Sequence, residues 1–151
     1  MSTPIKIIVI ISAIIVALAI TACACSLIFD KKIVTNTHEL NEAFTDVSIL
    51  TDTANILFLP AVDNQSKVIC EEKENMAHTV SIINGTLEIK LNDTRKWYEY
   101  IGINFGKTTV IVYLPQSEYK SISIDESTGD VYIPSNFKFE SIDVTVSTGD
   151  I

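Results

Sequence analysis

Cysteine is scarce in this 151-residue chain. It has three cysteines, and Cys23 and Cys25 lie in an apolar run near the N-terminus. Cys70 is therefore the lone cysteine of the remaining chain, so no disulfide can form within that part. In the sequence KVIC it alternates with Val68, which predicts a buried thiol that faces the core rather than a reactive one.

Basic residues are also few, and this limits the classes of partner. All nineteen acidic residues follow residue 29, together with ten of the eleven basic ones, so this part of the chain carries a formal charge of −9. Such a charge repels nucleic acid and anionic lipid headgroups, which attract clusters of lysine and arginine. We therefore expect no nucleic-acid partner.

The sequence lacks the residue patterns of common catalytic sites. Its two histidines, His38 and His78, lie in a polar segment and in the connector ENMAH, which does not suggest a Ser-His-Asp arrangement. The segment GINFGKTT has three residues between Gly102 and Gly106, whereas a P-loop has four, and it precedes a strand rather than a helix. We expect neither enzymatic activity nor a cofactor.

Charge is absent from one long run. Residues 7–29 read IIVIISAIIVALAITACACSLIF, and as a helix they would be about 34 Å long, enough to cross the hydrocarbon core of a bilayer. We therefore expect residues 1–6 to be a short flank and residues 7–29 to be a single-pass anchor in the lipid bilayer. Two alternatives stay open: ITAC resembles a lipobox that would make Cys23 a lipidation site, or a signal peptide is cleaved. The few lysines that flank the run do not decide its orientation.

Beyond this run the sequence changes character. Residues 30–44 are polar without a sustained period, which predicts a stalk, and residues 45–151 carry the period-2 alternation of β-strands. No long segment there has helical periodicity, so the domain is predicted to be all-β. In HTVSIINGTLEIKL the dipeptide Asn84-Gly85 separates two alternating runs and favours a type I′ turn, which predicts a hairpin over residues 80–91.

Aromatic residues gather in the stretch NDTRKWYEYIGINFG, which holds Trp97, Tyr98, Tyr100 and Phe105. These rings could form a ligand platform, or they could pack over an open end of the strand core, since each buries a large area. The second interpretation is favoured.

The letters STGD occur twice, twenty residues apart, and the strands before them also correspond. A repeat of this length, with short strands and a corner, indicates a β-solenoid-like fold of stacked coils of about twenty residues. Glycine allows a positive φ at the corner, and the hydroxyl and carboxyl side chains can bond amides that the turn leaves free. A weaker third copy, VSILTDTANI at residues 47–56, overlays Thr53, Ala54 and Asn55 on the STGD corner. The predicted structural turn residues are Ser127, Thr128, Gly129, Asp130, Ser147, Thr148, Gly149 and Asp150.

The repeated aspartates allow two interpretations. Stacked corners would place Asp130 and Asp150 about 5 Å apart, where a shared Ca²⁺ would remove the repulsion between them. Calcium takes six or more oxygens, and the glycine-aspartate nonapeptide of calcium-binding β-rolls is absent from the sequence. Carboxylates that cap backbone amides are therefore favoured over this metal site.

Taken in order, these motifs resemble a known bacterial family. The STGDV and STGDI corners, the segment TANILFLP, the hairpin NGTLEIK and the strand VYLP are similar to those of the putative adhesins, or DUF4097, β-strand-repeat proteins of unknown function. The resemblance implies a right-angled β-solenoid-like domain, outside the cell membrane of a Gram-positive-type bacterium, without a proven reaction. Members usually carry several more coils. We therefore expect that the chain is truncated at Ile151 or that its last coil pairs with another segment.

These observations favour a membrane-anchored extracellular β-repeat protein of the cell surface, with a binding or adhesion role. Its exposed Ser, Thr, Asp and Tyr side chains would contact a glycan, the cell wall or another protein. The alternative is a structural scaffold or envelope-stress accessory protein that assembles edge to edge through open β-strands.

Overall fold

The computed structural model describes residues 33–97 and 108–151. The expected flank at 1–6, the anchor at 7–29, Cys23 and the aromatic residues Tyr98, Tyr100 and Phe105 lie outside these residues. Within the two described ranges, no helix is long and apolar enough to cross a membrane.

The described chain is all-β, as its alternating pattern predicts. Nine strands occur in the order β1 Ile33–Glu39, β2 Asp46–Pro60, β3 Lys67–Lys73, β4 Met76–Ile83, β5 Thr86–Asp93, β6 Thr108–Leu114, β7 Glu118–Thr128, β8 Val131–Tyr132 and β9 Lys138–Thr148.

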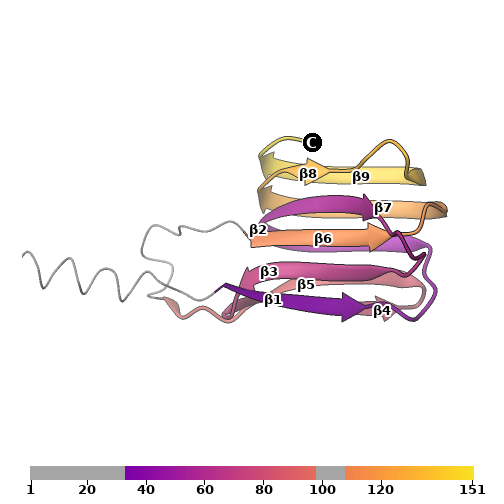
Figure 1. Ribbon diagram of the computed structural model, residues 1–151. Coiled ribbons are helices and arrows are strands. Elements are labelled where there is room, and N and C mark those ends of the chain that lie inside the picture. The colour runs from indigo at the N-terminus through magenta and orange to yellow at the C-terminus, as the bar shows by residue number, and fades with distance from the viewer. Residues whose placement is uncertain (1–32, 98–107) are drawn as a thin grey trace, which may run out of the picture. The chain divides into compact units, whose positions relative to one another are not determined.

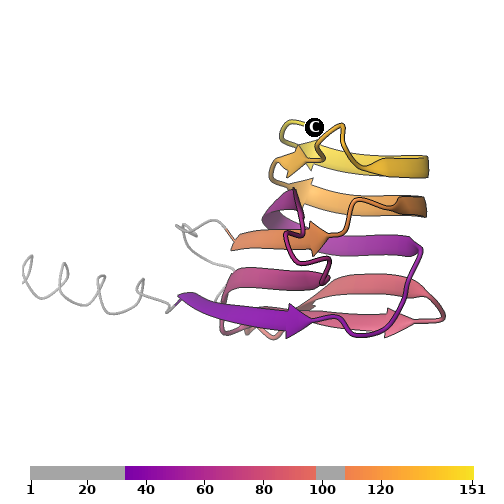
Figure 2. The same cartoon turned by 45° about the vertical axis from the view of Figure 1, so that its right-hand side comes forward.

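Strand β2 is shared by two sheets that face each other. Its first part pairs with β5 and β7, giving the order β4-β5-β2-β7-β9, and its second part pairs with β6 and β8, giving the order β1-β3-β6-β2-β8. Figures 1 and 2 show the strands as successive layers, with β8 and β9 at one end and β1 and β4 at the other. Alternate side chains of each strand point between the sheets and form the core, which includes Val47, Ile49, Ile56, Phe58, Val68, Leu87, Ile89, Val110, Val112, Leu114, Ile122 and Ile124.

Three segments stack in the register that the sequence repeat predicts. Strands β7 and β9 are parallel with an offset of twenty residues, so that Ile122 lies beside Ile142. The weaker third copy occupies the next layer, because β2 is parallel to β7 and places Val47 beside Ile122. After the corner, Ile56 pairs with Val131. The layers that begin with β2 and β7 each consist of a strand, a corner and a return strand, as in a coil of a solenoid, and β9 with its corner forms the next layer.

Parallel stacking extends to β5 and β6, which pair with the two parts of β2. Beyond them the stacking of coils ends, and there the solenoid-like prediction is wrong. Pairs β1–β3, β3–β6 and β4–β5 are antiparallel. The pairs β1–β3 and β3–β6 join strands that are not consecutive in the chain. For β4–β5 the cause is local, since a tight turn sends the chain straight back along its neighbour instead of into another coil. One such turn joins β4 to β5 through Asn84 and Gly85, whose φ angles are +51° and +79°, so the predicted hairpin is present.

The predicted stalk also differs from the structure, because residues 33–39 form β1 and pair with β3. Most side chains of β1 are exposed, and only Val34 and His38 are half-buried. The backbone of an edge strand bonds to its neighbour whatever its outward side chains are, so a polar sequence without alternation can still join a sheet.

Candidate functional site

The corners of the three coils are joined by backbone hydrogen bonds. The amide of Gly129 donates to the carbonyl of Thr148 (3.0 Å), and the amide of Ile56 donates to the carbonyl of Asp130 (2.9 Å). The amide of Val131 donates to the carbonyl of Asp150 (2.9 Å) in the same way. The two predicted sets of turn residues therefore lie together at one corner of the stack, with one set directly above the other.

One predicted carboxylate, Asp130, and the equivalent Asn55 cap amides across the coils. Oδ1 of Asp130 accepts a hydrogen bond from the amide of Asp150 (3.1 Å). One coil below, Oδ1 of Asn55 accepts from the amide of Asp130 (3.2 Å). Asn55 thus has the same capping role at its corner as Asp130 has at the next one. This role requires an oxygen acceptor but no charge. This geometry supports the amide-capping role that was favoured over a shared Ca²⁺.

Threonines form a row beside this ladder. Thr53, Thr128 and Thr148 are neighbours across β2, β7 and β9, and all three residues are exposed. Adjacent strands lie about 4.8 Å apart, so the corner presents hydroxyl groups at regular intervals. We call Thr53, Thr128 and Thr148 the threonine row.

A second group of polar residues lies inside the domain, and the sequence analysis did not predict it. His78, in β4, donates its backbone amide to Oε2 of Glu72 (2.7 Å), and its Nδ1 lies 2.7 Å from the same oxygen. Nε2 of His78 lies 2.8 Å from Oγ1 of Thr51. Asn36 donates to the other oxygen of Glu72 (2.7 Å). Glu72 is only 1 % exposed and His78 only 5 % exposed, so these partners replace the water that the carboxylate loses on burial.

Thr51, His78 and Glu72 are linked in the same order as the residues of a catalytic triad. The Thr51 hydroxyl would be the nucleophile, the His78 imidazole its base, and the Glu72 carboxylate the group that orients the base. A catalytic set must also meet its substrate. All three residues are buried, so a substrate cannot contact the hydroxyl of Thr51 unless the sheets separate. The arrangement is suited to holding β2, β3 and β4 together.

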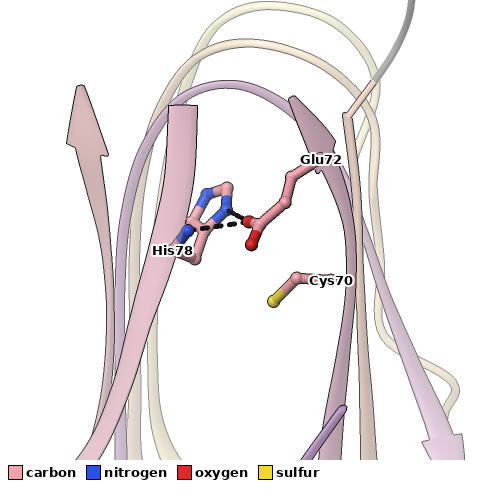
Figure 3. A group of neighbouring side chains, drawn as sticks. All are labelled: Cys70, Glu72 and His78. Atoms are coloured by element: carbon pink, nitrogen blue, oxygen red, sulfur yellow. Dashed lines mark hydrogen bonds and ion pairs between the residues drawn. The ribbon is translucent and has the colours of Figure 1, made fainter. Parts of the chain in front are cut away.

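Cys70 lies beside this pair, as Figure 3 shows. It is fully buried, as predicted, and burial raises the pKa of its thiol to about 12, with a further contribution from Glu72. Each of Cys70, Glu72 and His78 has a potential metal-ligand atom within 4.8 Å of the others. We call Cys70, Glu72 and His78 the buried cluster.

The raised pKa predicts slow alkylation of Cys70. In a Cys23→Ser, Cys25→Ser background with EDTA, the native thiol should react with iodoacetamide about a thousandfold more slowly than in urea, because the thiol pKa of about 12 compares with an ordinary value of 9.0. Mass spectrometry of timed samples measures both rates. Equal rates in the native and unfolded chains would show that Cys70 is exposed.

Another buried carboxylate lies at the corner. Glu126 is 1 % exposed, and its Oε1 accepts from the amide of Ala54 (2.8 Å), while its Oε2 has no hydrogen-bond partner. Burial raises the pKa of Glu126, the Ala54 amide opposes this, and Asp130 and Asp52 add to the increase.

This pKa increase predicts that Glu126 destabilises the domain at neutral pH. Protonation favours the folded state, so its contribution to stability is complete below the ordinary pKa of 4.5 and is lost as the pH rises through the higher pKa of the folded chain. Glu126→Gln should therefore match the parent in acid and unfold at a higher temperature at pH 7. Thermal unfolding across this pH range tests the prediction, with Glu118→Gln on the exposed start of β7 as the control. A Glu126→Gln variant that is less stable than the parent at pH 7 would contradict it.

The comparisons with known proteins agree with this architecture. Residues 44–151 match the family described as Toastrack DUF4097. No curated protein is significantly similar to the chain in sequence.

Solved structures share the fold. A putative adhesin from Bacteroides fragilis is similar with a TM-score of 0.53 and 19 % identity, over 80 % of this chain and 56 % of that one. A putative cell adhesion protein from Clostridium sporogenes has a TM-score of 0.56 and 11 % identity, over 78 % and 59 %. A putative adhesin from Parabacteroides distasonis has a TM-score of 0.52 and 11 % identity, over 81 % and 56 %.

The chain spans a little over half the length of these three structures. At such identities the likeness shows the fold alone, whereas the family match covers most of the chain, including the paired corners and the hairpin. The chain belongs to the Toastrack DUF4097 family.

Proposed function

We propose that this chain is a single-pass membrane protein whose extracellular β-repeat domain binds a surface ligand and so mediates adhesion, without catalysing a reaction. The threonine row is the observation that supports it most, because a regular row of exposed hydroxyls suits a ligand with its own regular repeat. The likeness to proteins described as adhesins supports the same role.

The charge of the domain narrows the class of ligand. Residues after 29 carry a formal charge of −9. On the outer face of β2, Asp46 accepts hydrogen bonds from Ser121 (2.6 Å) and Thr45 (2.8 Å), which lower the pKa of Asp46 and favour its charged form. A neutral glycan or a basic protein surface would tolerate this field, whereas an anionic polymer would be repelled.

The binding test uses the full chain in phospholipid vesicles. Soluble chito-oligosaccharide, sonicated peptidoglycan and an alkaline globular protein, lysozyme, represent a glycan, the cell wall and a basic protein surface. We expect saturable binding of at least one of these probes, with empty vesicles as the control. The absence of saturable binding across all three would count against the adhesion role.

The anchor and its orientation need a separate test. Protease added to intact cells should remove the β-repeat domain and leave the N-terminal segment in the membrane fraction. Protection of the domain until the cells are lysed would contradict the extracellular location. The mass of the mature N-terminus would distinguish an uncleaved anchor from lipidation at Cys23.

A scaffold role is the second candidate, and the outer edge of β9 supports it. In the described part of the chain, β9 pairs only with β7, and exposed strand edges can recruit another strand. Sedimentation of the full chain in detergent, with and without Ca²⁺, separates the candidates. Assembly that grows with concentration would favour the scaffold, and a dispersed monomer would favour binding. A change in sedimentation on addition of Ca²⁺ would support the alternative calcium site at Asp130 and Asp150.

A further inference from the structure

We propose that the buried cluster of Cys70, Glu72 and His78 is a binding site for a thiophilic divalent cation of the Zn²⁺ class. The inference is independent of the adhesion role, because the cluster lies between the sheets and not at the exposed corner.

The donor atoms suit this class of metal. Thiolate, imidazole and carboxylate are the three protein ligand types that Zn²⁺ takes, at distances of about 2.0 to 2.3 Å. Tetrahedral ligands at such distances lie roughly 3.3 to 3.8 Å from one another. The three donor atoms all lie within 4.8 Å of each other. To bind a common ion, the 2.7 Å contact between Nδ1 of His78 and Oε2 of Glu72 would lengthen by about 0.6 Å, while the longer separations in the cluster would shorten.

The backbone explains why these side chains meet. Cys70 and Glu72 are two residues apart in β3, so they point to the same face, and a turn at residues 74 and 75 brings β4 and His78 back against them. Figure 3 shows His78 and Glu72 pointing toward each other, with the sulfur of Cys70 directed toward the same space.

The polar atoms of His78 and Glu72 that would not bind the metal already have hydrogen-bond partners outside the cluster. Oγ1 of Thr51 lies against Nε2 of His78 (2.8 Å), which leaves Nδ1 facing Glu72. Asn36 donates to Oε1 of Glu72 (2.7 Å), which leaves Oε2 facing His78. Metal-binding histidines and carboxylates are commonly oriented by such outer hydrogen bonds.

The charges balance once the metal is bound. A divalent cation with the Glu72 carboxylate, the Cys70 thiolate and a neutral imidazole gives a formal charge of zero, which suits a buried site. Binding releases the thiol proton. The proton on Nδ1 of a neutral His78 moves to Nε2, where it can be donated to Thr51, and a cationic His78 would release one further proton.

Because the cluster is buried, the metal would bind the folded chain and stabilise it. Free Zn²⁺ at one hundred times its Kd would shift the folding equilibrium about a hundredfold toward the native state. The site has no exposed face, so its role is to hold β3 and β4 together.

The experiment loads the full chain, in a Cys23→Ser, Cys25→Ser background, with Co²⁺ and then with Zn²⁺ after refolding from EDTA. We expect one ion per chain, a near-ultraviolet thiolate-to-cobalt charge-transfer band, and a higher unfolding temperature with Zn²⁺ than with EDTA. Cys70→Ala should abolish the band. His38→Gln, which changes the other histidine, should leave it unchanged.

Two outcomes that would overturn the site use the parent chain alone, so they do not depend on the variants folding. A parent chain that refolds with Co²⁺ and shows no charge-transfer band, or that gains no thermal stability from Zn²⁺, has no such site. A band that survives in Cys70→Ala, or that is lost in His38→Gln, would place the metal elsewhere.

Discussion

Gly129→Ala should lower the free energy of unfolding by on the order of 3 kcal/mol, because this position has no room for a side chain. A Cβ atom there would lie 1.8 Å from the carbonyl oxygen of Ala54 and 2.4 Å from Oε1 of Glu126. The φ of Gly129, +156°, is also one that residues with a side chain rarely adopt. Since the carbonyl of Ala54 belongs to the next coil, relief would require the two corners to separate. Urea denaturation of the full chain in detergent, followed by tryptophan fluorescence, measures the change.

Two other glycines serve as controls. Gly85 has φ +79° and nothing within 4 Å of a Cβ, so Gly85→Ala carries only the backbone penalty of about 1 kcal/mol. At Gly149 a Cβ would lie 1.7 Å from the carbonyl oxygen of Gly129, but β9 has a described neighbour on one side only and can move outward. The expected cost there lies between the other two. Equal costs at Gly129 and Gly85 would contradict close stacking of the corners.

His78→Leu should also destabilise the domain strongly, by about 3 kcal/mol or more. The substitution removes the ring that contacts both Glu72 and Thr51. The carboxylate of Glu72 would then stay buried, and its remaining donors would be the backbone amide of residue 78 and the side chain of Asn36. Breaking a buried pair by removing one partner is costly, because the other partner keeps its desolvation penalty. The measurement is urea denaturation with EDTA present, so that bound metal does not contribute.

A double variant distinguishes the pair from simple loss of packing. Glu72→Leu with His78→Leu should be more stable than His78→Leu alone, since it removes the unpaired carboxylate. His38→Leu is the matched control, because the Nε2 of His38 is buried without a partner, and the change should be close to neutral. If the double variant were less stable than His78→Leu, the pair would not be the cause.

The stacking of coils could be predicted from the sequence because its signal is repeated. In parallel strands in register, each corner meets the corner of the next coil, so glycine is needed wherever a carbonyl approaches closely. Gly129 and Gly149 meet this requirement, and the twenty-residue spacing gave the register directly. The hairpin was predicted for a similar reason, because Asn84-Gly85 determines the turn without help from distant residues.

The buried cluster could not be predicted in the same way, because long-range pairing assembles it. His78 follows a short turn, so it looked like part of a connector, and its contact with Thr51 depends on the position of β2. One signal was present: Glu72 follows Val68 and Cys70 in the alternating pattern of KVICEE, at a core position. A carboxylate there requires a buried partner. Strand β1 had no such signal, since its side chains are mostly exposed.

The most direct test of the adhesion account removes the hydroxyls of the threonine row. Thr53→Val, Thr128→Val and Thr148→Val together preserve the shape and strand preference of each side chain, and Thr35→Val with Thr37→Val on β1 is the control. The measurement is the affinity of the vesicle-bound full chain for whichever probe binds the parent. We predict at least a tenfold loss with the threonine-row variant and no change with the control. Equal affinity of the parent and the threonine-row variant would contradict the proposal that this corner is the binding surface.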